Sequence, residues 1–162
     1  MLKARLLFRG TRMTNPRYPA VILILMLAAA TPALGQEPSA AGRIKVVSGP
    51  AFIVRSGGLI PAQAGQIVFE ADGLRTGVDG HMGVTLKDDT RVSLGPSSEL
   101  RVEHFVYAPA NGGLGLVLKI VRGAVAYVSG QIAKLSPDSV RLETPAAIVG
   151  VRGTSLAIHV EP

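Results

Sequence analysis

The side chains of this sequence that could do chemistry include three histidines, His81, His104 and His159. A zinc site needs three or four converging ligands, often with two at short spacing, and these histidines lie far apart in the sequence. Glu103 and His104 are neighbours, so in a strand they would point to opposite faces. The spacing therefore predicts no metal site, and the histidines are expected to be exposed or half-buried.

Motifs for a nucleophile or a bound phosphate are also missing. Ser, His and Asp all occur, but there is no Gly-x-Ser-x-Gly elbow. No pair of carboxylates has apolar neighbours that would raise the pKa of one member, so that it could act as an acid while the other acts as a base. Residues 112–115 are glycine-rich but enter a strand pattern, with no helix start behind them to hold phosphate. The chain has no Cys, and we expect no catalytic residue, no cofactor and no enzymatic activity.

A charged row is the first candidate for a polar docking surface. Glu99, Arg101 and Glu103 are spaced by two residues, so in a strand they share one face. Such a row is usually a solvated face, and it could instead protect a sheet edge against aggregation. If the domain has a polar docking surface, these three residues are one place where we expect it.

A second candidate is the tripeptide of Arg152, Gly153 and Thr154. It could act as a partner-contact or ligand-binding element. The architectural interpretation is favoured, in which Gly153 allows a bulge and Arg152 is solvated or held by a carboxylate. We therefore keep these three residues as possible interaction or motif residues.

The charge of the chain is unevenly distributed. It has 162 residues, with 17 Lys and Arg against 11 Asp and Glu. Five of these cations precede residue 36, in a stretch without acids: Lys3, Arg5, Arg9, Arg12 and Arg17. The remaining 12 cations and 11 acids are interleaved. Binding of nucleic acid requires clustered cations on the folded part, so we expect no nucleic-acid partner.

Residues 1–35 are typical of a signal peptide. A basic stretch precedes 11 apolar residues, 20–30, the length of a signal h-region and shorter than the roughly 20 residues of a spanning helix. Ala33 and Gly35 are the small residues that precede a cleavage site, so we expect cleavage after Gly35. An uncleaved anchor is the alternative. Either way, the rest should be periplasmic or secreted, with membrane contact only through the signal segment.

The remaining chain is expected to be a short tether, residues 36–42, and one all-β domain, residues 43–162. Apolar residues recur at period two, in short runs closed by Gly, Pro, Asp or Asn. The run at 114–121 is apolar on both faces, so it should be a central strand covered on both sides. Residues 131–136 have only mild helical potential.

A turn with two consecutive aspartates lies between two strand patterns. A loop of residues 88–90 would pair Leu86 with Val92, and Asp89 tolerates the left-handed conformation that such a loop needs. An arc between stacked layers is the alternative.

Shifts of the apolar parity predict two bulges. One shift falls between Val102 and Phe105, and the other between Val151 and Leu156. The second contains Gly153, a residue type that often marks a bulge.

Several short motifs follow one another in a set order. They are Gly65, Asp72-Gly73-Leu74-Arg75-Thr76-Gly77, Asp79-Gly80, residues 84–90, residues 94–100, Arg122-Gly123-Ala124-Val125, Thr144-Pro145-Ala146-Ala147 and Val151-Arg152-Gly153-Thr154. The ordered set, over about residues 72–154, resembles the FecR domain, an extracytoplasmic domain named after the ferric-citrate regulator of Gram-negative bacteria. It departs at the turn, where the family usually has Asp-Gly-Ser and this chain has Asp88-Asp89-Thr90.

The resemblance implies an all-β domain of short strands, either small β-helical turns in tandem or a sandwich-like arrangement. In the regulators it implies a protein-binding, signal-relaying role, with a cytoplasmic helical region that controls a sigma factor. Only about 19 residues precede the hydrophobic stretch here, so we do not expect control of a sigma factor. A free-standing exported FecR-like domain is expected instead.

The expected function is therefore a non-enzymatic sensory, scaffold or interaction module that binds an envelope protein, for example by adding a strand at a sheet edge. Binding of carbohydrate, such as peptidoglycan or a surface polysaccharide, is the alternative. Carbohydrate platforms usually use exposed aromatic rings, and the few aromatics after residue 35 should mostly be core: Phe52, Phe69, Phe105, Tyr107 and Tyr127. A small exported hydrolase is disfavoured because no catalytic cluster is present. The sequence names neither the partner nor the oligomeric state.

Overall fold

The computed structural model describes residues 39–151 and 155–161. The chain divides into two compact units, residues 1–36 and 37–162, and all described residues belong to the second. The expected signal peptide and its cleavage point after Gly35 lie outside the described residues. Within the described ranges, no helix is long and apolar enough to cross a membrane.

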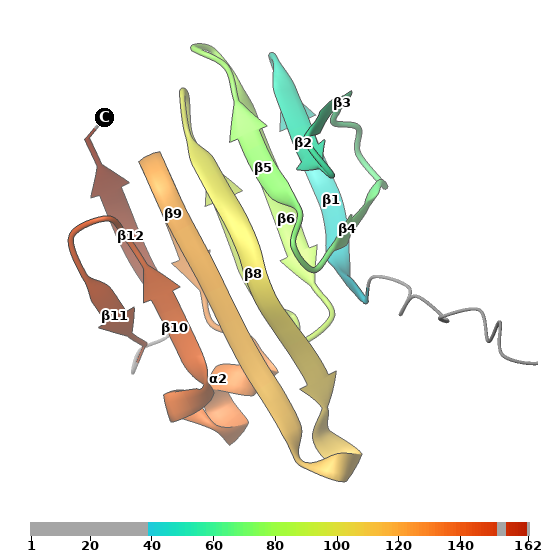
Figure 1. Ribbon diagram of the computed structural model, residues 1–162, viewed down its shortest axis with the longest axis vertical. Helices are drawn as coiled ribbons and strands as arrows, with labels where there is room; N and C mark the ends of the chain where they lie inside the picture. Colours follow the sequence, from blue (N-terminus) through green and yellow to red (C-terminus); the bar gives the residue numbers. More distant parts are fainter. Residues whose placement is uncertain (1–38, 152–154, 162) are drawn as a thin grey trace, which may run out of the picture. The chain divides into compact units, whose positions relative to one another are not determined.

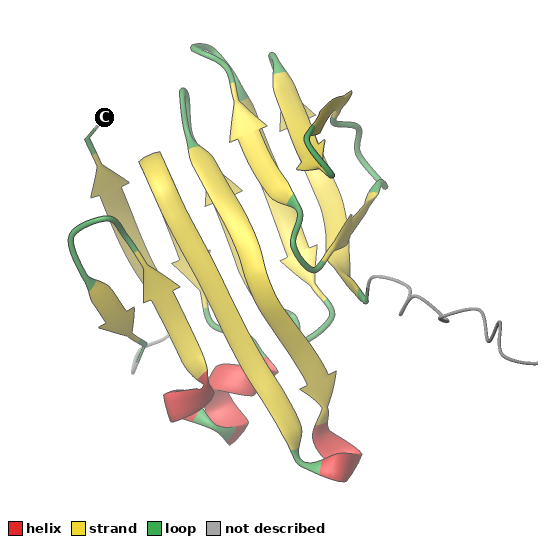
Figure 2. Cartoon of the chain, in the orientation of Figure 1, coloured by secondary structure: helices red, strands yellow, loops and turns green. Residues whose placement is uncertain are grey.

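The described unit is almost entirely β-structure, as the period-two pattern predicts (Figures 1 and 2). Its strands are β1 (Ala40–Ser48), β2 (Ala51–Arg55), β3 (Gly58–Pro61), β4 (Ile67–Phe69), β5 (Gly73–Thr76), β6 (His81–Leu86), β7 (Arg91–Leu94), β8 (Glu99–Ala108), β9 (Gly113–Val128), β10 (Val140–Glu143), β11 (Ile148–Gly150) and β12 (Ser155–Val160). Its helical segments are η1 (Pro109–Asn111), α2 (Gln131–Leu135) and η2 (Pro137–Ser139). β1 begins at Ala40, three residues before the expected domain boundary.

The strands form one sheet that curls into two layers. The path is β3-β2-β5-β8-β9-β7-β6-β1-β4, with β10 and β12 also paired to β9, and β11 paired to β10. We call β3, β2, β5, β8, β10 and β11 with the first part of β9 the front sheet, and β4, β1, β6, β7 and β12 with the second part of β9 the back sheet. All pairs are antiparallel except β9 with β10. This pairing corresponds to the sandwich-like alternative rather than to tandem β-helical turns.

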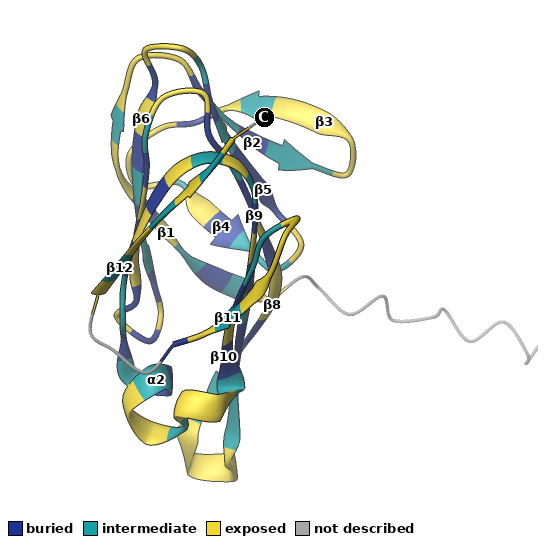
Figure 3. Cartoon of the chain, turned by 90° about the vertical axis from the view of Figure 1, so that its left-hand side faces the viewer, coloured by how far each residue is buried: buried dark blue, intermediate teal, exposed yellow. Residues whose placement is uncertain are grey.

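The hydrophobic core lies between the two sheets, and buried positions alternate along the strands (Figure 3). In β6 and β7, for example, Met82, Val84 and Leu86 are buried with Val92 and Leu94. Residues between them on the same strands are exposed or half-buried. Burial of one face of each strand is the main favourable contribution to the stability of this fold.

β9 passes from one layer to the other (Figure 3). The bend falls at Gly123, between Arg122, which lies opposite Glu99, and Val125, which lies opposite Leu94. The inward side chains change parity there, from Leu118 and Ile120 before the bend to Val125 and Tyr127 after it. Gly123 has φ 83°, a conformation that favours glycine. The central position of this strand is confirmed, but its expected covering on both faces fails at Lys119, whose outward side chain is exposed, while the outward Val117 and Val121 are half-buried.

The turn between β6 and β7 differs by one residue from the expected loop. Asp89 has φ 66°, so its left-handed conformation is confirmed. The Leu86 N–H donates to the Thr90 carbonyl at 2.8 Å, and Val84 lies opposite Val92. The predicted pairing of Leu86 with Val92 is therefore wrong. The loop is residues 87–89, because Thr90, although polar, faces the interior.

The first predicted bulge is confirmed. The register of β8 against β9 shifts between Val102 and His104, and the buried positions change from Val102 to Phe105 across that shift. The second predicted bulge, at Gly153, lies outside the described residues.

Candidate interaction surface

The charged row of β8 is held in ion pairs. Two nitrogens of Arg75 donate to the Glu99 carboxylate at 3.0 and 3.2 Å, and Arg122 lies 3.4 Å from it. Arg101 and Glu103 are 3.7 Å apart and more exposed. Because two cations already neutralise Glu99, only the Arg101–Glu103 end of the row is open to a partner.

The edge-protection alternative for this row is wrong at its first two residues. Glu99 and Arg101 pair with β5 on one side and with β9 on the other, so β8 is an interior strand there. The neighbouring His104 lies 3.1 Å from Glu70 through its Nδ1. The second candidate group, Arg152, Gly153 and Thr154, lies outside the described residues, and its role stays a prediction.

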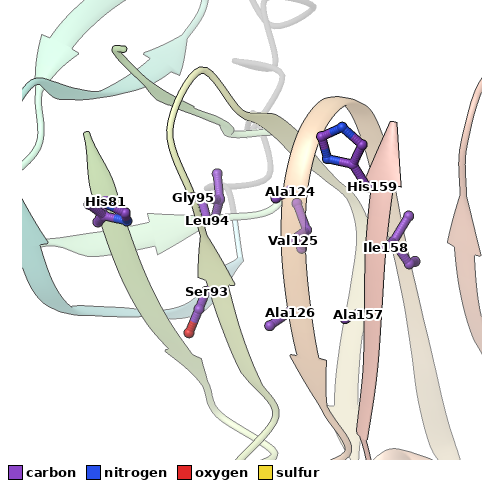
Figure 4. Close-up of a pocket in the computed structure, with 10 residues that line it drawn as sticks. All are labelled: His81, Ser93, Leu94, Gly95, Ala124, Val125, Ala126, Ala157, Ile158 and His159. Carbon is purple, nitrogen blue, oxygen red and sulfur yellow. The ribbon is translucent and has the colours of Figure 1, made fainter. Parts of the chain in front are cut away.

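A shallow hollow of about 400 Å³ lies on the outer face of the back sheet (Figure 4). Its lining includes the small residues Ser93 and Gly95 of β7, Ala124 and Ala126 of β9, and Ala157 of β12. Ser93 lies opposite Ala126, and Ala126 opposite Ala157. Because these side chains are short, the backbone of three neighbouring strands lies close to the surface.

Two exposed histidines stand on either side of the hollow (Figure 4). His81 comes from β6 and His159 from β12, and the two strands are separated by β7 and β9. Three strand spacings put the two backbones about 14 Å apart, too far for both rings to bind one metal ion. Among residues 39–151 and 155–161, no group of three or more His, Asp or Glu is placed to hold a metal.

β12 borders the hollow and is an edge strand. It pairs with β9 along its whole length, and no other described strand pairs with it. Its inward residues Leu156, Ile158 and Val160 are only half-buried, although they pack against the core. A strand of this kind presents unpaired backbone groups and incompletely covered apolar side chains. We call β12 and the hollow together the β12 surface.

The described aromatic residues are buried or half-buried, whereas carbohydrate platforms usually use exposed rings. Phe105 and Tyr127 are buried, and Phe52, Phe69 and Tyr107 are half-buried. Phe69 is covered by the Arg55 guanidinium, 4.5 Å above its ring. Of the five rings that were expected to be mostly core, Phe105 and Tyr127 belong to it and Tyr107 packs against it, while Phe52 and Phe69 do neither. No described aromatic residue is exposed.

The sequence reasoning did not find the β12 surface. The small residues of the hollow occupy the outward positions of strands whose inward positions are apolar, as with Ala124 and Ala126 around the buried Val125. An unusual run of small residues at solvent-facing positions was the available signal. It could be used only once the order of the strands was known.

The comparisons with known proteins give one match. The family model described as FecR protein matches residues 72–162. This match spans more than half of the chain, from just before β5 to the end of β12. Neither the curated proteins nor the solved structures include a match.

Proposed function

Since this chain belongs to the FecR protein family, we propose that it is a sensory or interaction module of the cell envelope that binds a protein partner and catalyses no reaction. The observation that carries the proposal is the β12 surface. An edge strand with an unpaired side can accept a strand of another protein, whose backbone hydrogen bonds supply affinity.

The hollow beside β12 suits such a partner. The short side chains of Ala126 and Ala157 leave room on the outer face of the back sheet for partner side chains that reach over β12 from the added strand. The half-buried Leu156 and Ile158 supply apolar surface that becomes fully covered when a strand is added. Specificity would come from the rim, where His81 and His159 are exposed.

The proposed location is the periplasm of a Gram-negative envelope. It rests on the basic and apolar composition of residues 1–35 and on the family. The full chain should be expressed with its own N-terminus, and the exported form should be isolated and its first residue determined. Export with cleavage after Gly35 gives a chain that begins at Gln36. Recovery of the uncleaved chain in the cytoplasm would contradict the proposed location.

The partner proposal is tested with lysine substitutions in the hollow. The tagged full chain, expressed with its own N-terminus, is crosslinked in the envelope, and copurifying proteins are identified by mass spectrometry. Ala126→Lys and Ala157→Lys place a long charged side chain on the β12 surface, and both residues are exposed. Ala110→Lys makes the same change at an exposed position in η1. A partner captured by the unchanged chain and by Ala110→Lys, and lost from both hollow variants, is the expected result.

Two results would overturn this proposal. Equal capture of the same protein by all variants would remove the β12 surface from the interaction. Recovery only with the insoluble glycan fraction, with release by glycan digestion, would replace the protein partner with a carbohydrate. Circular dichroism of each variant shows whether the fold is retained, so that loss of capture can be assigned to the surface.

A further inference from the structure

Cations without an acidic partner gather at one end of the back sheet. They are Arg43 and Lys45 of β1, Lys87 of the β6–β7 turn, Arg91 of β7 and Lys134 of α2, and all five are exposed. Within the described residues, none of the five forms an ion pair with an acidic side chain. We call this group the cationic end.

The five cations line two adjoining hollows. Arg43, Lys45 and Lys87 line the first, and Arg91 and Lys134 line the second. Thr85 and Asp89 belong to both hollows, so the two form one continuous surface. The strand register places Arg43 and Arg91 on either side of Thr85, two strand spacings or about 10 Å apart. Asp89 is the one acidic residue that lines either hollow.

Four arginines elsewhere in the described residues are neutralised. Arg55 is paired with Asp72, Arg75 and Arg122 with Glu99, and Arg101 with Glu103. All of these pairs involve the front sheet or the segment just before β5. Lys119 and Arg141 of the front sheet are exposed and form no ion pair with a described acidic residue either. Of the seven described cations outside ion pairs, five lie at the cationic end, around the β6–β7 turn.

The N-terminal segment enters the domain at the cationic end. Ala40, the first residue of β1, lines the same hollow as Arg43 and Lys87. Eight residues, 31–38, separate the apolar run at 20–30 from the first described residue. A fully extended chain of this length reaches about 30 Å. If the apolar run stays uncleaved in a bilayer, the cationic end is held within that distance of the lipid surface. After cleavage behind Gly35, attraction to the lipid rests on the cations alone.

We propose that the cationic end docks on an anionic phospholipid surface. Basic residues near such a surface are attracted to its negative potential, each by about 1 kcal/mol. The cations lie on four separate parts of the fold around two open hollows, which suits a spread of phosphate groups better than a single small anion.

The experiment compares lipid compositions. The full chain is incubated with vesicles of phosphatidylcholine alone, or with about 30% phosphatidylglycerol, and bound protein is measured by cosedimentation at about 0.1 M and 0.5 M salt. The phosphatidylcholine arm measures any contribution of the apolar run that does not depend on lipid charge. The five cations before residue 36 are the same in every variant, so differences between variants exclude their contribution. We expect at least about tenfold stronger binding to anionic vesicles at low salt, and loss of that difference at high salt.

Matched double variants assign the effect to the cationic end. Lys87→Gln/Lys134→Gln removes two charges there, and Lys119→Gln/Arg141→Gln removes two from exposed positions of the front sheet. The first pair should weaken binding to anionic vesicles by about fivefold per cation, and the second pair should leave it near the unchanged level. Both pairs replace exposed side chains, and thermal unfolding confirms that each variant is folded.

Several outcomes would overturn this inference. Equal binding to both lipid compositions would do so, as would equal weakening by both double variants. Displacement from vesicles by millimolar inorganic phosphate would indicate a free phosphate site, and preference for a polyglutamate peptide over anionic vesicles would indicate an acidic protein segment. Protein capture through the β12 surface should be unchanged in Lys87→Gln/Lys134→Gln, so the two proposals can fail separately.

Discussion

The hydroxyl of Thr90 donates a 2.7 Å hydrogen bond to the Asp88 carboxylate at a position where neither residue is exposed to solvent. The carboxylate also accepts the backbone N–H groups of Thr90 at 3.2 Å and Ile132 at 3.3 Å. The Thr90 Oγ1 in turn accepts the Gly130 N–H at 3.1 Å. Two polar side chains thus join the β6–β7 turn to the start of α2, and their hydrogen bonds make burial of the pair tolerable.

Replacing Asp88 should therefore destabilise the fold. Asp88→Ala leaves the Thr90 hydroxyl and the Ile132 N–H buried without an acceptor, and each such loss costs about 1–3 kcal/mol. We expect the free energy of unfolding, measured by urea denaturation, to fall by about 3 kcal/mol. The exposed Asp89 is the control, since Asp89→Asn keeps a residue type that accepts positive φ and should change stability by less than about 0.5 kcal/mol. Similar stability of both variants would contradict the structural role of Asp88.

This junction also explains why the loop is residues 87–89 rather than the predicted residues 88–90. Alternation predicts which residues of a strand face the core, and it correctly placed Leu86, Val92 and Leu94 inside. It treats a polar residue as part of the loop, however, and Thr90 is polar but buried. Its burial depends on Gly130, which is 40 residues further along the chain. No local pattern contains that contact.

The candidate site was less predictable than the fold, for the same physical reason. The spacing of Glu99 and Arg101 predicts that they share one face of a strand. It does not predict that two arginines from other strands, β5 and β9, neutralise Glu99. The β12 surface depends on which strands are neighbours, and small residues such as Ala126 carry no periodic signal of their own. Charge counted along the sequence likewise hid the cationic end, whose members are separated by up to 91 positions, from Arg43 to Lys134.

The bend of β9 gives a prediction about two glycines. An added Cβ at Gly123 would lie 2.5 Å from the Cα of Ser98, while at Gly112 it would meet nothing within 4 Å. Both have positive φ, 83° and 69°. Gly112→Ala should therefore cost only the backbone strain, about 1 kcal/mol, and Gly123→Ala should cost at least about 2 kcal/mol more, because Ser98 must move. Thermal or urea unfolding measures both, and equal losses would show that the overlap is relieved without cost.

The ion pair between Arg55 and Asp72 gives another prediction. Two Arg55 nitrogens donate to the carboxylate at 2.7 and 2.8 Å, and Asp72 is 2% exposed. The pKa of Arg55 is raised by its hydrogen bond to Asp72. Arg55→Gln leaves a buried carboxylate without its charge partner, and we expect a loss of about 2 kcal/mol, less than for a fully buried pair because Arg55 is partly exposed.

The control for this prediction is the exposed Arg101–Glu103 pair, 3.7 Å apart. Arg101→Gln should change the free energy of unfolding by less than about 0.5 kcal/mol. The two variants make the same chemical change, so the difference between them reports on burial of the acidic partner. Equal, small effects in urea denaturation would mean that Asp72 is adequately stabilised by its remaining contact, the Phe69 N–H at 2.8 Å.

Alkaline pH should weaken the fold through Tyr127. Burial raises the pKa of this residue above its ordinary value of 10.0; the hydroxyls of Ser129 and Thr90 lower it in part, and the charge of Asp88 raises it further. Above about pH 10 the unfolded tyrosine loses its proton before the folded one, so the free energy of unfolding falls as pH rises further. Tyr127→Phe lacks the ionisable hydroxyl. Its free energy of unfolding, measured with urea, should therefore decline less steeply between about pH 9 and 11. Below about pH 9 the two curves should run parallel, because Tyr127 is then protonated in both states. Parallel curves across the whole range would show that Tyr127 ionises equally easily in the folded and unfolded chain.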